Sequence, residues 1–311
     1  MRHSQETIDK IMTLHQAGIK SRKIAKEVLG SSSKKSSVND IIARYRNTDI
    51  EEHQGPKVLF FDIETAPVLG NVWGLFQQNV GLNQIHKEWH ALSWAAKWMH
   101  SDEVMYEDQR GEPDVEDDFL LLQGIWRLLD QADIVVGHNS RRFDSKKLNA
   151  RFILNGMSPP SHYRQIDTLE IAKRHFGFTS NKLAWLTDKL CENHKKMDHQ
   201  KFAGFELWKE CLAGNMEAWD EMELYNKVDV LSLEELYYKL APWSNQIPNF
   251  NLYRKDQKCS CGSTHIEVNG YHYTNQSVFQ RYRCADCGAQ SRGKKNLLDK
   301  EQRSSQRVNL V

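Results

Sequence analysis

The chain has 311 residues, 40% of them hydrophobic, including nine tryptophans and twelve phenylalanines. This is enough for one large domain with a hydrophobic core plus smaller modules. No apolar run approaches the roughly 18 residues that span a membrane, and MRHSQETIDK at the start is not of signal-peptide type, so we expect a cytosolic protein.

The net charge of +1 hides an uneven distribution of charge. Residues 1–46 carry 10 Lys/Arg against 4 Asp/Glu, and residues 250–311 carry 11 against 5. Residues 47–249, between them, carry 21 against 32. Basic ends around an acidic body indicate polyanion contacts at the ends and metal binding in the middle. The alternative is that small domains and tails are often basic without such a partner.

Residues 1–46 predict a module of three short helices. The first has an apolar stripe, the second is SRKIAKEVLG, and the third is SSVNDIIARYR. This layout, with basic residues on both later helices, is helix-turn-helix-like and favours DNA binding. Its turn, GSSSKKS, is longer than the usual three or four residues, and the alternative is a small bundle for protein contacts. A polar linker, residues 47–56, follows.

Residues 57–243 predict an α/β domain. Its pattern is a strand at 57–63, strands near 89–98 and 103–108, a helix near 116–131, a strand at 133–137, a helix from about 143 to 155, a short strand ending near Ile166, and helices from Asp167 through 240. Asp167 and Glu170 in DTLE fit a helix-capping box. We therefore assign Asp167 a structural role and leave it out of the predicted metal site.

Four carboxylates and a tyrosine in this domain predict a common site. Asp62 and Glu64 end the apolar run VLFF at i and i+2, so they leave one face of a strand. Tyr225 and Asp229, at i and i+4, share one face of a helix, and Asp144 follows the buried-strand signal IVV. Four acids held together repel one another, so such a cluster normally holds cations.

Hard divalent metals and phosphate chemistry fit this cluster. Two Mg²⁺ or Mn²⁺ ions about 4 Å apart activate a water and stabilise the leaving oxygen of a phosphodiester. We expect Asp62 to bridge both metals, Glu64 and Asp229 to complete the one nearer the nucleophile, and Asp144 to serve the other. The phenol of Tyr225 would orient or help deprotonate the attacking water.

The three motifs resemble those of the DnaQ-like, or DEDD, 3′–5′ exonucleases of the ribonuclease H-like superfamily. They are D-x-E at Asp62 and Glu64, N-x3-F-D from Asn139 through Phe143 to Asp144, and Y-x3-D at Tyr225 and Asp229. The tyrosine marks the DEDDy branch, because the histidine position of the DEDDh branch is Leu224 here. The likeness looks closest to stand-alone, often phage-encoded, relatives of the family B polymerase exonuclease domain.

This resemblance implies a mixed sheet flanked by helices and hydrolysis of nucleic acid from the 3′ end to nucleoside monophosphates. It also implies that Thr65, which follows Glu64, helps hold the terminal 3′-hydroxyl, and it makes Asn139 and Phe143 candidate substrate contacts. In NVWGLFQQNVGLNQI, Trp73 and Phe76 would stack on frayed 3′ bases. Packing in the core or a lid is the alternative for these two aromatic residues.

Two cysteine pairs in residues 250–295 predict a zinc ribbon. The pairs are Cys259 with Cys261 and Cys284 with Cys287, with 22 residues between Cys261 and Cys284, and each pair ends in Cys-Gly. In a cytosolic protein this pattern favours one structural Zn²⁺ held by four thiolates over disulfides. The first pair is C-x-C, whereas zinc ribbons usually have C-x2-C. This crowds the first pair, so His265 is an alternative to one of the cysteine ligands.

The alternative for Cys284 and Cys287 is a redox pair. Arg281, Arg283, Arg292, Lys294 and Lys295 surround the expected ribbon and favour a nucleic-acid contact. Cys191 and Cys211, in helical stretches, are expected to be inert packing residues, and residues 296–311 form a polar tail.

The sequence as a whole predicts a three-part 3′–5′ exonuclease, with DNA favoured over RNA because a helix-turn-helix suits duplex DNA. One alternative is a transposase- or recombinase-like protein of ribonuclease H fold. Such a protein normally carries a late Glu as its third acid, so the Y-x3-D motif argues against it. The other alternative is a catalytically silent DNA-binding regulator.

Overall fold

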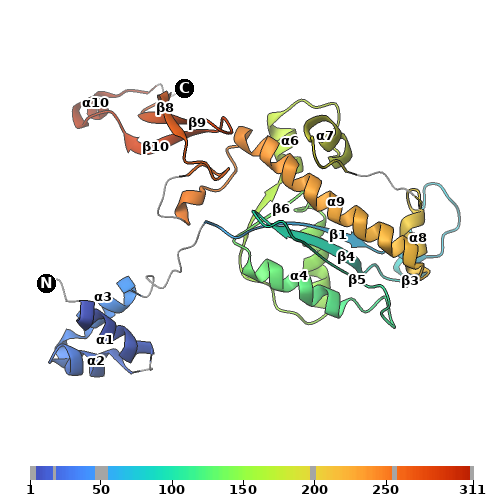
Figure 1. Cartoon of the computed structure of the whole chain (residues 1–311), viewed down its shortest axis with the longest axis horizontal. Coiled ribbons are helices and arrows are strands. Elements are labelled where there is room, and N and C mark those ends of the chain that lie inside the picture. The colour runs from blue at the N-terminus through green and yellow to red at the C-terminus, as the bar shows by residue number, and fades with distance from the viewer. Residues whose placement is uncertain (1–4, 17–18, 46–54, 197–200, 254–257, 309–311) are drawn as a thin grey trace. The chain divides into compact units, whose positions relative to one another are not determined.

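The computed structural model describes residues 5–16, 19–45, 55–196, 201–253 and 258–308. The chain divides into two compact units, residues 1–54 and 55–311, and Figure 1 shows the elements of each. Among the helices in the described ranges, none is both long and apolar enough to cross a bilayer.

The N-terminal unit contains the three predicted helices. They are α1 (Gln5–Gln16), α2 (Ser21–Val28) and α3 (Lys35–Tyr45), and the short 3-10 helix η1 (Ser32–Lys34) lies between the last two. Their apolar stripes meet in a small core, formed by Ile8, Ile11, Ile24, Ala25, Val38, Ile41 and Ile42. The prediction of a helical module is therefore confirmed, whereas DNA binding by this module stays a prediction.

The second unit is built on a five-stranded mixed sheet of order β5-β4-β1-β6-β7. The strands are β1 (Val58–Thr65), β4 (Ala91–Trp98), β5 (Val104–Asp108), β6 (Ile134–Gly137) and β7 (Arg164–Asp167). Central β1 pairs antiparallel with β4 and parallel with β6. These five strands confirm the predicted α/β pattern. A short pair, β2 (Leu69–Gly70) and β3 (Ile85–Lys87), with the 3-10 helix η2 (Leu82–Gln84), was not predicted.

Helices cover both faces of this sheet. On one face, α9 (Met216–Leu240), α6 (Thr168–His175) and α7 (Leu183–Leu190) pack on Val58 and Phe60. On the other, α4 (Phe119–Gln131) and α5 (Asp144–Leu154) pack on Leu59, Phe61 and Ile63. Figure 1 shows the long α9 crossing the sheet. Because side chains alternate along a strand, Asp62 and Glu64 continue the face that α9 covers.

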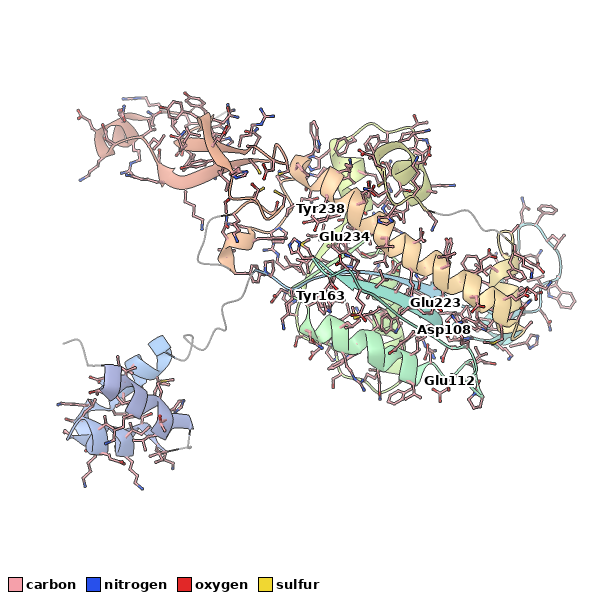
Figure 2. The ribbon with its side chains drawn as sticks, viewed as in Figure 1. Asp108, Glu112, Tyr163, Glu223, Glu234 and Tyr238 are labelled. Carbon is pink, nitrogen blue, oxygen red and sulfur yellow. The ribbon has the colours of Figure 1, made fainter. Side chains whose placement is uncertain are left out.

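Ion pairs fix α9 against the edge of the sheet. Arg110, which follows β5, lies 2.7 Å from Asp108, 2.8 Å from Asp220 and 2.6 Å from Glu223. Asp108 on β5 and Glu223 on α9 are labelled in Figure 2. Since α9 also carries Tyr225 and Asp229, this partly buried network helps to set the position of the third motif above β1.

The C-terminal segment is a small three-stranded sheet with almost no core. After the 3-10 turns η3 (Ala241–Trp243) and η4 (Phe250–Leu252) come β8 (Ile266–Tyr273), β9 (Val278–Cys284), β10 (Gln290–Asn296) and helix α10 (Lys300–Ser305). The residues between the two cysteine pairs of the predicted zinc ribbon form β8 and β9, while β10 follows the second pair. Within the described residues 258–308, Cys284 alone is buried. Hydrophobic burial therefore contributes little to the stability of this segment.

Candidate active site

The carboxyl end of β1 carries the first two acids of the site. Strand pairing with β4 is regular through Glu64 and shifts between Glu64 and Thr65. Irregularities of this kind often lie beside active sites, where they change the direction of side chains. One carboxylate oxygen from each of Asp62, Glu64 and Asp229 lies within 4.8 Å of the other two. The structure thus brings together three of the four predicted acids at metal-binding distance.

Helix α9 supplies Tyr225, Asn226 and Asp229 on adjoining positions. Asn226 is fully buried, and its side-chain amide donates a hydrogen bond of 2.8 Å to Asp62 Oδ2. Its carbonyl oxygen accepts from the hydroxyl of Ser93 on β4 at 3.2 Å. This chain of hydrogen bonds fixes the carboxylate of Asp62 in one orientation. The sequence did not point to Asn226, because a single Asn within a helix has no distinctive pattern.

Asp144, the fourth acid, begins α5 and is buried. Its Oδ1 accepts a hydrogen bond of 3.2 Å from the backbone N–H of Ile63, between Asp62 and Glu64. The turn before it requires Gly137, where a Cβ atom would lie 2.4 Å from that of Ser140. Asp144 therefore lies against the strand of the first motif, although it is outside the group of three acids within 4.8 Å.

Asp167 holds the second motif in place without joining the acid cluster. Its carboxylate accepts from the backbone N–H groups of Asn139 at 2.9 Å and Arg141 at 3.2 Å. It also accepts from Leu169 N–H at 3.0 Å as the N-cap of α6. The capping role of Asp167 is confirmed. The reciprocal half of the predicted box is wrong, because Glu170 pairs with Arg141 at 3.3 Å.

Asn139 occupies a conformation that suits its residue type. Its φ of 65° lies in the left-handed region, which Asn tolerates better than most residues. Its backbone N–H donates to Asp167, and its carbonyl accepts from the N–H groups of Arg142 at 3.1 Å and Phe143 at 3.0 Å. These backbone bonds position the turn that leads to Asp144. The structure therefore gives Asn139 a positioning role, and its predicted substrate contact stays a prediction.

Burial and mutual repulsion disfavour the charged forms of the acids. Burial, followed by the charges of Asp144, Glu64 and Asp229, raises the pKa of Asp62 well above its usual value. Burial and then Asp229 raise the pKa of Glu64, while Lys196 and the Trp208 indole oppose the rise. Burial also raises the pKa of Asp144. A group of acids in this state is stabilised by any cation that enters it.

Lys196 is the cation that the sequence analysis missed. Its ammonium group forms an ion pair with Asp229 Oδ2 and lies 4.3 Å from the ring centroid of Tyr225. Burial opposes the charge of Lys196, but Asp229, Tyr225 and Asp62 outweigh it and raise the pKa of the lysine. No sequence pattern singles out Lys196 among 42 Lys and Arg residues.

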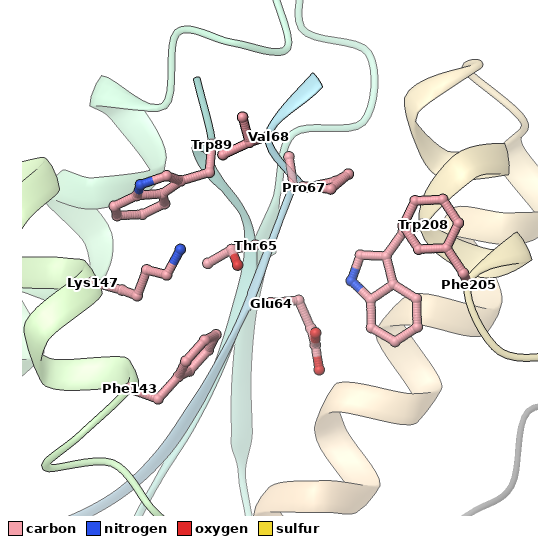
Figure 3. Close-up of a pocket in the computed structure, with 10 residues that line it drawn as sticks. Glu64, Thr65, Pro67, Val68, Trp89, Phe143, Lys147, Phe205 and Trp208 are labelled. Atoms are coloured by element: carbon pink, nitrogen blue, oxygen red, sulfur yellow. The ribbon is translucent and has the colours of Figure 1, made fainter. Parts of the chain in front are cut away.

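A cleft of about 470 Å³ opens beside Glu64. In Figure 3, Trp89, Lys147 and Phe143 stand on one side, Phe205 and Trp208 on the other, and Glu64 and Thr65 lie between them. The ammonium of Lys147 lies 3.6 Å from the Trp89 ring centroid. The volume is that of a small-ligand site. Two predicted substrate contacts, Thr65 and Phe143, therefore line this cleft.

Trp73 and Phe76 are not among the residues that line the cleft. Their side chains are 95% and 84% exposed in the segment between β2 and η2. Exposure of this degree contradicts core packing for both residues, whereas packing in a lid stays an alternative to stacking. Stacking on substrate bases by Trp73 stays a prediction.

The four C-terminal cysteines form a second candidate metal site. Their sulfur atoms lie within 4.8 Å of one another, with 3.5 Å between Cys259 and Cys287 and 3.8 Å between Cys261 and Cys284. Four sulfurs about 2.3 Å from a tetrahedral zinc ion are about 3.8 Å apart, whereas a disulfide requires about 2.05 Å. The spacing fits a Cys₄ zinc site.

The loops around these cysteines have the expected knuckle geometry. Gly262 and Gly288 have φ values of 92° and 76°, which glycine adopts without strain. His265 is exposed and its Nδ1 lies 3.1 Å from Asp286 Oδ1, so it is outside the group of four sulfurs. The remaining cysteines, Cys191 and Cys211, are buried in apolar clusters, as predicted.

The chain belongs to the RNase_H superfamily, because the family model of that description matches residues 59–241. Membership of this superfamily supports a nuclease, a hydrolase that acts on nucleic acid. No curated protein matches the chain. Among solved structures, the family B DNA polymerase from the hyperthermophilic archaeon Pyrobaculum calidifontis is similar, with 18% sequence identity and a TM-score of 0.44. The match covers 60% of this chain and 25% of the polymerase chain.

Proposed function

We propose that the protein is a metal-dependent 3′–5′ exonuclease of the DEDDy type. The observation that carries this proposal is the convergence of Asp62, Glu64 and Asp229, with Asp144 beside them, at one end of an aromatic cleft. An acid cluster next to a cleft of small-ligand size suits a reaction at one bound nucleotide. The order and spacing of the three motifs support this class of enzyme.

The carboxylates fit two hard divalent cations, Mg²⁺ or Mn²⁺. Asp62, Glu64 and Asp229 would hold one ion, and Asp62 with Asp144 the other. When bound, such ions supply an activated water and charge stabilisation at the phosphate. Asn226 keeps the Asp62 carboxylate oriented for this role, as its 2.8 Å hydrogen bond indicates.

Tyr225 acts by orientation. Burial, and then the charge of Asp229, raises the pKa of its phenol above the usual value. A tyrosine phenol is protonated at neutral pH even at its usual pKa of about 10, and the raised pKa makes loss of its proton still harder. This favours orienting the attacking water over removing its proton. Trp208 packs edge-on against this ring, with 6.2 Å between ring centroids, and limits its movement.

Both the cleft and the N-terminal helical module bear on the proposed substrate. Thr65 and Phe143 line the cleft and are the proposed contacts of the 3′-terminal nucleotide. The aromatic walls suit stacking on bases of any sequence. We propose DNA over RNA because a basic module of three helices, of helix-turn-helix layout, precedes the catalytic domain.

The C-terminal ribbon is proposed to hold one structural Zn²⁺ through Cys259, Cys261, Cys284 and Cys287. The sulfur spacing and the scarcity of buried residues support this assignment. A zinc ion would replace the missing core as the source of stability, as in other small zinc modules.

Linear and circular single-stranded DNA of one sequence test the proposed function. With Mg²⁺, the linear form is expected to be degraded and the circular form to persist, because an exonuclease needs an end. Asp62→Asn should abolish degradation. Asp188→Asn, at an exposed acid outside the site, is the matched control and should keep full activity. Cutting of the circle would instead indicate an endonuclease or a transposase-like enzyme.

A further inference from the structure

The two faces of the C-terminal sheet differ in chemistry. Arg281 on β9 is the register partner of Arg292 on β10, and Arg283 lies two residues along β9, so all three arginines share one face. The opposite face carries aromatic and apolar side chains, which are Val268, Tyr271, Tyr273 and Tyr282. One small sheet, labelled β8 to β10 in Figure 1, thus presents a cationic face and an aromatic face.

The cationic face is electrostatically unfavourable by itself. Like charges directly across two strands destabilise a sheet, and Arg281 and Arg292 are such a pair. In the described part of the chain, no carboxylate lies within 4.0 Å of a guanidinium nitrogen of Arg281, Arg283 or Arg292. Glu267, the register partner of Arg283, is the acid on this face. An external anion would relieve this repulsion.

All three arginines are exposed, and Arg281 and Arg292 are already oriented. Arg281 Nε donates a hydrogen bond of 2.6 Å to the carbonyl of Asn269, which leaves its terminal nitrogens available. The Arg292 guanidinium carbon lies 4.1 Å from the ring centroid of Phe279, on the same face. A guanidinium held in this way loses less entropy on binding and matches the geometry of phosphate oxygens.

We infer that this face, Arg281, Arg283 and Arg292, binds the sugar-phosphate backbone of the nucleic acid at a site separate from the catalytic cleft. Adjacent arginines on β9, at i and i+2, are about 7 Å apart along the strand, so they suit a row of phosphates. Lys294 and Lys295 extend the positive charge along β10. The inference rests on the proposed function for the identity of its ligand.

This site would raise affinity for long substrates without taking part in the chemistry. Phosphate contacts hold a strand in register but carry no sequence information. A substrate long enough to reach both the cleft and the ribbon would dissociate more slowly than a short one. Short oligonucleotides, held by the cleft alone, would be cleaved at the same rate with or without the arginines.

The test is salt-dependent DNA binding by the full-length protein. Fluorescence anisotropy with a labelled 30-nucleotide single strand gives the Kd at NaCl concentrations between 50 and 200 mM. No Mg²⁺ or Mn²⁺ is added, and no chelator is used, because a chelator would remove the zinc of the ribbon. The variant Arg281→Gln/Arg283→Gln/Arg292→Gln is expected to bind at least about 10-fold more weakly. Its slope of log K against log salt should fall by about 2, because each phosphate contact on a single strand contributes about 0.7. Tyr271→Ala/Tyr273→Ala, on the opposite face, is the matched control and should keep the wild-type slope.

Three results would overturn the inference. They are an unchanged slope in the arginine variant, weaker binding in the tyrosine variant alone, and displacement of DNA by a polyglutamate peptide of equal charge at equal concentration. The zinc content of each variant reports whether its ribbon is folded.

Cleavage separates this inference from the proposed function. With Mg²⁺, the arginine variant should cleave a four-nucleotide substrate at the wild-type rate. If the wild type cleaves nothing but its DNA binding still depends on the arginines, the exonuclease proposal fails and this inference stands.

Discussion

The proposed catalytic domain and the C-terminal ribbon are stabilised in different ways. In the domain, apolar clusters on both faces of a five-stranded sheet fix the elements that carry the acids. In the described ribbon, a single buried residue, Cys284, provides no comparable core. Metal therefore has a different proposed role in each region. In the cleft it would relieve repulsion within a preformed site, whereas in the ribbon it would be a condition of folding.

The largest expected effect is loss of cleavage on removing one acid of the cleft. Asp62→Asn removes the carboxylate that both metals are proposed to share. The variant should therefore lose several kcal/mol of transition-state stabilisation, which lowers the rate about 10³-fold. The variant should keep the fold, because apolar clusters and not metal stabilise this domain. Single-turnover cleavage and thermal unfolding check both parts. A variant with wild-type rate would defeat the assignment of the site.

Cys284→Ser should unfold the ribbon and spare the catalytic domain. Replacing one thiolate of four removes the zinc and with it the main source of stability of this segment. We expect zinc content to fall from one equivalent to near zero and the ribbon to become sensitive to protease. Four-nucleotide cleavage should persist. If the variant keeps its zinc and its ribbon still resists protease, another group, such as His265, completes the site.

Tyr225→Phe should lower kcat by about 10- to 100-fold with little change in KM. This loss is smaller than the 10²- to 10⁴-fold that general acid–base catalysis typically contributes. The reason is that the raised pKa of the phenol favours orienting the water over removing its proton. Steady-state kinetics on a short oligonucleotide provides the measurement. An unchanged kcat would place Tyr225 outside the catalytic step.

Trp73→Ala should raise KM for single strands about 5-fold or more, since stacking on one base contributes roughly 1–3 kcal/mol. The melting temperature should not change, because the side chain is 95% exposed. Trp73→Phe keeps an aromatic ring and should behave almost as wild type. An unchanged KM for the alanine variant would remove Trp73 from the substrate contacts.

The smallest effect concerns pH and the metal-free cleft. The folded-state pKa of Glu64 is raised to about 8 by burial and by Asp229, above an unfolded value of about 4.3. Because the folded state holds this proton more tightly, protonation of Glu64 stabilises the fold fully at a pH below the unfolded-state pKa. This stabilisation is lost as the pH rises through the folded-state pKa. Without added Mg²⁺ or Mn²⁺, and with the ribbon zinc kept in place, the melting temperature of Glu64→Gln should therefore rise increasingly above that of the wild type between pH 5 and 9, by a few degrees.

Added Mg²⁺ should remove most of this difference by stabilising the wild type, as binding to the folded state requires. A melting difference between wild type and Glu64→Gln that is independent of pH would show that the acid cluster is not strained by its own charge.

The sequence predicted those parts of the site that depend on local periodicity. Asp62 and Glu64 follow from strand alternation, and Tyr225 and Asp229 from one helical turn. Lys196, Asn226 and Trp208 were not foreseen, because only the tertiary packing of distant segments brings them to the acids. Strand β10, QSRGKKN, lacks apolar alternation, and its pairing with β9 decides its structure. The four-cysteine spacing was predictable, but the arrangement of the arginine face depends on strand register.

The most direct test of the central claim is a time course with 5′-labelled and 3′-labelled copies of one single-stranded DNA and Mg²⁺. A 3′–5′ exonuclease should give a descending ladder of 5′-labelled products and immediate release of the 3′ label as a mononucleotide. Asp62→Asn should give neither. Intact DNA in every lane with Mg²⁺ and with Mn²⁺, or release of the 5′ label first, would contradict the central claim.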